Sequence, residues 1–267
     1  MLGLISRTKM VVQMVHELRR ERSSPRNDDP ADGTVFILDG VGGIMLVPLC
    51  VRRGLWDAGL PGSIEIYDWH SGPRGELLGD LIAYRRNLRK AAVFAEVLTE
   101  RRRRYPDAPL HVVAFSGGSG LATFAIEQLP ADVLLDVVVL GCSALSPRYR
   151  LTGMLRHVRI CVALVSSRDR YLIGLGTTLF GTMDRRFGPG AGLRGFRRPT
   201  PFGDEDAQAY DKLHQLPWRP HMRSLGHYGH HVGCATSAFI AQYMAPILLN
   251  QCDAPMHHGP FDANATL

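Results

Sequence analysis

The sequence predicts an α/β fold, a three-layer α/β/α sandwich whose mostly parallel sheet carries helices on both faces. Two observations lead to this prediction. Short apolar runs rich in β-branched residues, typical of buried strands, alternate with segments that have helical periodicity. Glycine-rich stretches directly follow two of these runs, at residues 39–43 and 116–120, where we expect a strand to turn tightly into a helix.

Length and composition agree with one soluble globular domain. The chain has 267 residues, of which 45% are hydrophobic and 21% charged, and a core of this size needs no disulfide or metal for stability. Part of the net charge of +6 comes from short arginine clusters such as residues 101–104. That cluster ends a predicted helix, where cations suit the helix dipole, so we favour a solvated surface over nucleic-acid binding.

Cysteine usage and hydropathy point to a cytoplasmic protein. The five cysteines are odd in number and widely spaced, which fits a reducing compartment better than a disulfide framework. No apolar run is long enough to span a membrane. We expect no signal peptide, because residues 1–15 lack a long apolar core and a small-residue cleavage site.

The elements are expected in the following order. Residues 1–33 form an amphipathic helix (4–22) and a polar linker, residues 34–251 the α/β domain, and residues 252–267 a frayed tail. Within the domain, the apolar patterns predict strands at 34–38, 63–67, 110–114, 133–140 and 160–165, a last edge strand at 221–225, helices at 44–58, 76–104 and 121–129, a final helix capped by Thr236 or Ser237, and an insertion or lid within 171–220.

The chain is organised around Ser116, which lies between a buried strand and a helix. The residues two positions before and after it are Ala114 and Gly118. A serine forced into a strained turn with positive φ brings strand and helix so close that larger side chains would clash. The pattern therefore predicts a nucleophile elbow, although a phosphate-binding loop or a plain structural turn uses similar glycines. A Walker loop would need a lysine, and a dinucleotide loop needs a glycine spacing that is missing here.

On the motif from Ala114 to Gly118, the sequence resembles the α/β-hydrolase family, with alanine in place of the first glycine. The resemblance covers about residues 34–250 and implies a serine esterase-like or lipase-like enzyme. In this family a glycine-rich loop after an early strand supplies one backbone donor of the oxyanion hole. Carried over by position, the donors are the N–H groups of Val41 and Gly117. Asp39 is a departure, since the family often has histidine there.

The resemblance also implies the acid of a catalytic triad. The family usually places it two strands after the nucleophile, and Asp169 follows the strand predicted at 160–165. An aspartate at this point also suits the cap of a turn or helix. The long gap to the histidines keeps three alternative acids open, which are Asp204, Asp206 and Asp211.

The general base is expected in the loop before the final helix. His231, in His-x-Gly, matches the family best, followed by His227 and then His230. An imidazole suits this role because its pKa lies near neutral pH. A zinc site formed by these histidines and Cys234 is a rival interpretation, but adjacent histidines rarely bind one ion together, and we predict no metal and no cofactor.

The sequence thus favours a serine hydrolase with the triad Ser116, Asp169 and His231, acting on a small-molecule acyl ester. Two hypotheses of other classes stay open. One is a non-catalytic hydrolase-like binding or scaffold domain, which the alanine of the elbow and Asp39 would permit. The other is a nucleotide-binding protein that uses the glycine loops.

Overall fold

The computed structural model describes residue 12, residues 28–70 and residues 77–249. Apart from Val12, the helix expected at 4–22 lies outside these residues, as does the tail expected at 252–267. Among the described helices, none is long and apolar enough to cross a bilayer.

A single sheet of six strands forms the centre of the described chain. Its order is β2-β1-β3-β4-β5-β6, and every neighbouring pair is parallel. The strands predicted from the first five apolar runs are all present, with ends that differ by a few residues. The strands are β1 (Thr34–Leu38), β2 (Ser63–Tyr67), β3 (Leu110–Phe115), β4 (Leu135–Gly141), β5 (Val158–Val165) and β6 (Leu213–Pro217).

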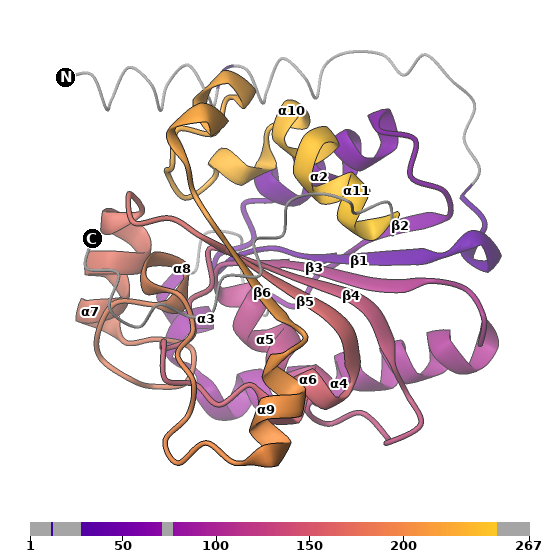
Figure 1. Ribbon diagram of the computed structural model, residues 1–267, viewed down its shortest axis with the longest axis horizontal. Coiled ribbons are helices and arrows are strands. Elements are labelled where there is room, and N and C mark those ends of the chain that lie inside the picture. The colour runs from indigo at the N-terminus through magenta and orange to yellow at the C-terminus, as the bar shows by residue number, and fades with distance from the viewer. Residues whose placement is uncertain (1–11, 13–27, 71–76, 250–267) are drawn as a thin grey trace.

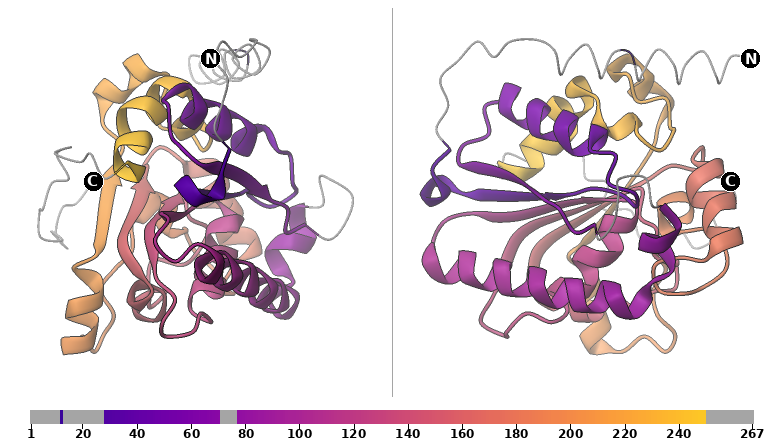
Figure 2. Two further views of the ribbon diagram at one scale, coloured as in Figure 1. Left: turned by 90° about the vertical axis from the view of Figure 1, so that its right-hand side faces the viewer. Right: turned by 180° about the vertical axis from the view of Figure 1, so that it is seen from behind.

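Helices cover both faces of this sheet, so the three-layer α/β/α prediction is confirmed. In Figures 1 and 2, α4 and α5 lie on one face and α2, α10 and α11 on the other. The helical elements are η1 (Pro30–Asp32), α2 (Leu46–Asp57), α3 (Leu77–Ile82), α4 (Tyr84–Arg104), α5 (Gly117–Ile126), α6 (Thr152–Arg156), η2 (Arg170–Gly176), α7 (Thr177–Phe180), α8 (Ala191–Arg194), α9 (Asp204–Tyr210), η3 (Pro220–Leu225), η4 (Gly233–Ala235), α10 (Ser237–Phe239), η5 (Ile240–Met244) and α11 (Ala245–Leu248).

The core lies on both faces of the central strands. All six residues of β3 are buried, and so are all but one residue of β4, because helices pack on both sides of these strands. This explains why their sequences are continuous apolar runs rather than alternating ones. The large side chains with the least exposure include Phe94 of α4 and Phe124 of α5.

Three of the predicted elements differ in the structure. The last strand is β6, and residues 221–225 belong to the 3-10 helix η3, because Pro220 at its start has φ set for a helix and cannot donate to a strand. The helix predicted at 76–104 is divided at Ala83 into α3 and α4. The final helix begins after Thr236 as expected, but it widens into the π-helical segment η5 ahead of Pro246, which lacks the N–H of a regular turn.

The region 171–220, expected as an insertion or lid, contains regular structure. It includes most of η2, then α7, α8 and α9, and the edge strand β6. The chain therefore leaves the sheet after β5, builds a cap of short helices, and returns to complete the sheet. Figure 1 shows α3, α7 and α8 gathered beyond the carboxyl ends of the strands.

We predict that buried His111 makes the fold sensitive to acid. Burial within β3 lowers the pKa of His111 to about 4, whereas an unfolded histidine titrates near 6.5. The unfolded chain binds the extra proton between these values, so the stabilisation present above pH 6.5 falls as the pH drops towards 4, by up to about 3 kcal/mol. The measurement is the free energy of unfolding in denaturant at several pH values.

The matched variant is His111→Leu, which keeps the strand apolar. It should lose less stability than the wild type between pH 7 and pH 4.5. Burial also lowers the pKa of His227 to about 4, so the part of the pH dependence of stability that comes from His227 remains in this variant. An identical pH dependence in variant and wild type would contradict the prediction.

Candidate active site

Ser116 occupies a strained turn between β3 and α5. Its φ of 49° and ψ of −120° are unusual for a residue with a side chain. The Ser116 N–H donates to the carbonyl of Gly141 at the end of β4 (2.8 Å), and α5 begins at the next residue, Gly117. This is the strand–turn–helix geometry that lifts a serine hydroxyl clear of the sheet, and it gives the chain an α/β-hydrolase-like fold.

The helix can approach the sheet this closely only because Gly118 lacks a side chain. A Cβ at Gly118 would lie 2.2 Å from the carbonyl oxygen of Asp39 and 3.1 Å from the Cβ of Leu38. The Asp39 carbonyl cannot easily move aside, because it accepts a hydrogen bond from the indole N–H of Trp69 (2.9 Å). Ala114, on the other side of Ser116, is fully buried. Small residues at both positions are therefore a packing requirement of the turn.

The glycine-rich loop after β1 is held in shape by the carboxylate of Asp39. One of its oxygens accepts the N–H of Gly40 and the other the N–H of Met45, each at 2.8 Å. Burial raises the pKa of Asp39, and the two backbone donors oppose this rise. Gly42 and Gly43 have positive φ, so the loop turns where side chains would be strained. Asp39 thus fastens both ends of the loop.

This loop brings the Val41 backbone beside the start of α5. A Cβ added to Gly117 would lie 3.3 Å from the Val41 nitrogen and 2.5 Å from its Cγ1. Among the described residues, neither the Val41 N–H nor the Gly117 N–H has a protein acceptor. Two neighbouring backbone donors next to Ser116 are what an oxyanion hole requires, and their assignment to this role stays a prediction.

A second group of side chains supports the loop from outside, and the sequence did not reveal it. Asp80 of α3 is buried and accepts the N–H of Gly42 (3.1 Å). The Nε2 atom of His70 lies 2.8 Å from the carbonyl oxygen of Gly40. His70 follows β2 by three positions, and no local pattern links Asp80 to Gly42, which lies 38 positions earlier.

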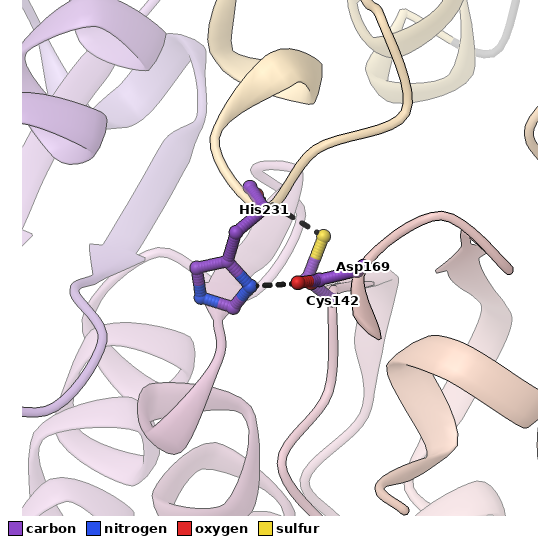
Figure 3. A group of neighbouring side chains, drawn as sticks. All are labelled: Cys142, Asp169 and His231. Atoms are coloured by element: carbon purple, nitrogen blue, oxygen red, sulfur yellow. Dashed lines mark hydrogen bonds and ion pairs between the residues drawn. The ribbon is translucent and has the colours of Figure 1, made fainter. Parts of the chain in front are cut away.

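Asp169 and His231 meet at the carboxyl end of β5 (Figure 3). Asp169 follows the strand and is buried, and its Oδ2 atom lies 2.5 Å from Nδ1 of His231. His231 comes from the loop between η3 and η4, 62 positions along the chain. The carboxylate thus faces the ring nitrogen that must be held if the opposite nitrogen is to act as a base.

The alternative acids and bases lie in other surroundings. Asp206 on α9 is bound by the guanidinium of Arg150 at 3.0 and 2.8 Å and by the hydroxyl of Thr152. Asp204 and Asp211 flank it at the two ends of that helix. His227 is buried edge-on against Phe239, and burial lowers its pKa to about 4. His231, the histidine that matches the family best, is paired with Asp169 through Nδ1.

Cys142 connects the serine and histidine sides of the site. It follows Gly141, the residue that accepts the Ser116 N–H, and its thiol donates to the carbonyl of His231 at 3.2 Å. The neighbouring thiol of Cys234 and burial raise the pKa of Cys142, so the thiol stays protonated and can donate. No sequence motif marks Cys142, because its role depends on its position after β4 and on its positive φ.

The atoms that Cys142, Asp169 and His231 offer lie within 4.8 Å of one another and are of types that bind metals. In the structure, however, the imidazole and the carboxylate are paired with each other and the thiol bonds to a carbonyl (Figure 3). The four residues of the rival zinc set, His227, His230, His231 and Cys234, do not form a metal-binding group among the described residues.

Comparison with known proteins gives only distant likenesses. No known protein family and no curated protein matches this sequence. Similar solved structures are a Trichoderma reesei cutinase (12% identity, 94% of this chain and 91% of that chain, TM-score 0.41), a carboxylesterase from Mesorhizobium loti (14%, 79% and 88%, 0.43) and esterase PE8 (16%, 82% and 97%, 0.42). These likenesses are too distant to transfer an activity or a residue role.

We predict that Gly118→Ala disturbs the turn at Ser116, because its Cβ would overlap the Asp39 carbonyl. The expected loss is about 1–3 kcal/mol in the free energy of unfolding, measured in denaturant. The control is Gly203→Ala, where a Cβ meets nothing within 4 Å and the change should be below about 1 kcal/mol. Equal stabilities of the two variants would show that the close approach is not needed.

Proposed function

We propose that this protein is a serine hydrolase that cleaves a carboxylic ester or related acyl bond through an acyl-enzyme. The observation that carries the proposal is the contact between the Asp169 carboxylate and the His231 ring. The end of β4 connects this contact to the strained Ser116 through two neighbouring residues, Gly141 and Cys142. Gly141 binds the serine backbone and Cys142 binds the histidine backbone. These two contacts support placing the hydroxyl and the imidazole in one site.

The first half of the reaction forms the acyl-enzyme. The Ser116 Oγ attacks the acyl carbon while Nε2 of His231 takes the hydroxyl proton. Asp169 accepts the hydrogen bond from Nδ1, which fixes the ring orientation and stabilises the charged imidazolium. The imidazolium then gives its proton to the departing alcohol, and the C–O bond of the ester breaks.

The negative charge that develops on the carbonyl oxygen needs donors that are already in place. The N–H groups of Val41 and Gly117 supply them, and each donor of this kind is worth about 10²–10³ in rate. Asp39 does not touch the substrate and acts as a positioning residue, since it holds the loop that carries Val41.

The second half of the reaction repeats these steps with water. His231 removes a proton from a water molecule, the resulting hydroxide attacks the acyl carbon, and Ser116 leaves with the proton. The products are the carboxylic acid and the free enzyme, and the chemistry requires no cofactor.

We predict that Ser116→Ala abolishes hydrolysis of p-nitrophenyl esters and labelling by a fluorophosphonate. His231→Ala should also lose nearly all activity, and Asp169→Asn should lower kcat by a factor of about 10⁴. The measurement is initial rates with esters of increasing acyl length, beside His227→Ala as the matched histidine control.

Wild-type activity in Ser116→Ala would overturn the mechanism. Loss of activity in His227→Ala with full activity in His231→Ala would show that His227, and not His231, is the general base. A folded protein that never labels would favour a non-catalytic binding domain. A rise in melting temperature with nucleotide and no labelling would favour the nucleotide-binding hypothesis.

We predict that Asp39→Asn lowers kcat by about tenfold or more with little change in KM. The asparagine amide would present a donor to the N–H of either Gly40 or Met45, so the loop would lose one of its two ties and Val41 its alignment. The measurement is kcat and KM with a short-chain ester.

The control for this prediction is Asp57→Asn in α2, which removes only an exposed pair with Arg53 and should leave both constants unchanged. A change confined to KM in Asp39→Asn would argue against a role for Asp39 in transition-state stabilisation.

A further inference from the structure

The segment from Arg168 to Arg198 has an unusual surface. It begins beside Asp169 and runs through η2, α7 and α8. Both α7 and α8 contact η2, and α8 also packs on β5. The segment lies beyond the carboxyl ends of the strands in Figure 1 and in the right-hand view of Figure 2. Ser116 and His231 lie at the same end of the sheet.

Almost all of the exposed side chains in this segment are either arginines or large apolar residues. The apolar ones have exposed fractions of 48–70%, and the one other exposed side chain is a threonine. The apolar residues are Tyr171, Leu172, Leu175, Leu179, Phe180 and Phe187, and the arginines are Arg168, Arg170, Arg185, Arg186, Arg194, Arg197 and Arg198. We call these thirteen side chains the arginine–leucine surface.

No acidic side chain offsets this charge at the surface of the segment. Its two acids are Asp169, which is buried against His231, and Asp184, which is half-buried and accepts hydrogen bonds from Ser146 and Thr182. Seven arginines against two aspartates supply most of the net charge of +6 of the whole chain. The surface is therefore complementary to a partner that is negatively charged outside and apolar within.

Apolar and basic side chains lie together after α7. The guanidinium of Arg185 lies near the carbonyl of Phe180 (3.5 Å) and 6.0 Å from the ring of Phe187. The neighbouring helix α3 contacts α7 and adds the exposed side chain of Ile82. Isolated exposed apolar residues are ordinary, but six large ones on a single short segment indicate an interaction site.

We propose that the arginine–leucine surface docks on an anionic lipid surface. Exposed leucine and phenylalanine side chains enter the boundary of the acyl chains, while the surrounding arginines bind lipid phosphates. A nucleic acid fits less well, because three of the six apolar side chains are leucines, which offer no stacking faces for bases. A second copy of the chain fits less well too, because the same seven arginines would face one another.

The docking also indicates a substrate class, and this part rests on the proposed function. When this surface binds the membrane, the carboxyl ends of the strands, and with them Ser116, face the lipid. The substrate is then the ester of an acyl lipid in an anionic membrane. Its hydrolysis consumes one water molecule and gives a fatty acid and the deacylated lipid.

The docking test is flotation of the full-length Ser116→Ala protein with vesicles, since this variant should leave the lipid intact. We expect binding to vesicles that contain phosphatidylglycerol and weaker binding to phosphatidylcholine alone or at high salt. Adding Leu175→Gln with Leu179→Gln, or Arg185→Gln with Arg186→Gln, should reduce the partition coefficient by about tenfold or more.

The matched control is Leu134→Gln with Arg103→Gln. Both residues are exposed, and they lie at the opposite edge of the sheet, before β4 and at the end of α4. The control should float like the parent protein. Thermal unfolding of each variant separates a loss of docking from a loss of fold.

Several results would overturn the docking proposal. They are absence of binding to anionic vesicles, equal binding by surface and control variants, a dimer that these substitutions dissociate in place of vesicle binding, or tighter binding of a single-stranded oligonucleotide through the same residues.

The docking and the proposed function fail separately. If the wild-type protein floats with vesicles but hydrolyses no soluble ester, the docking proposal stands and the proposed enzymatic function is wrong. If it hydrolyses soluble esters but does not float, only the docking proposal is wrong. Release of fatty acid from the bound vesicles supports the substrate class, and its absence in a protein that hydrolyses soluble esters overturns it.

Discussion

The contact between Gly118 and the carbonyl oxygen of Asp39 is the constraint on which the site depends. A Cβ at Gly118 would lie 2.2 Å from that oxygen, so α5 and the loop after β1 are too close for any side chain at this position. The Trp69 indole holds the carbonyl from the other side. Because α5 must start at this distance from β1, Ser116 has no room for an ordinary conformation and takes a positive φ. The same approach places the Val41 and Gly117 N–H groups next to each other, so the strain on the serine and the pairing of the donors have one cause.

The parallel sheet explains how residues that are distant in sequence come together. Adjacent parallel strands end at one edge, so Ser116 after β3, Cys142 after β4 and Asp169 after β5 lie there in the order of the strands. His231 belongs to none of these strands. It is bound from two sides, since its ring meets Asp169 and its carbonyl meets the Cys142 thiol. The loop that carries the imidazole is thus tied to two strand ends, which restricts the directions in which the ring can point.

The surface beside the site follows from the same connectivity. After Asp169 the chain cannot continue in the sheet, and it forms short helices before it returns as β6. These helices bury Ile173 and Leu193 against the domain, and their other face presents leucines, phenylalanines and arginines. The acid that holds the histidine therefore stands at the base of the segment whose outer face we assign to lipid. Catalysis and docking would share one edge of the molecule, which suits a substrate that is embedded in a surface.

The amino-acid sequence by itself determined the alternation of buried strands and helices, the turn at Ser116 and the ranking of Asp169 and His231, because these depend on local patterns and on the order of elements. It misplaced the last strand at residues 221–225, since β6 is a short edge strand that a polar segment can form when β5 supplies the hydrogen bonds. Only the tertiary structure decided which acid meets which histidine, and that Asp80 and Cys142 support the site. Such contacts join residues tens of positions apart, so a local sequence pattern cannot predict them. They form only after the strands have paired and their carboxyl ends lie side by side.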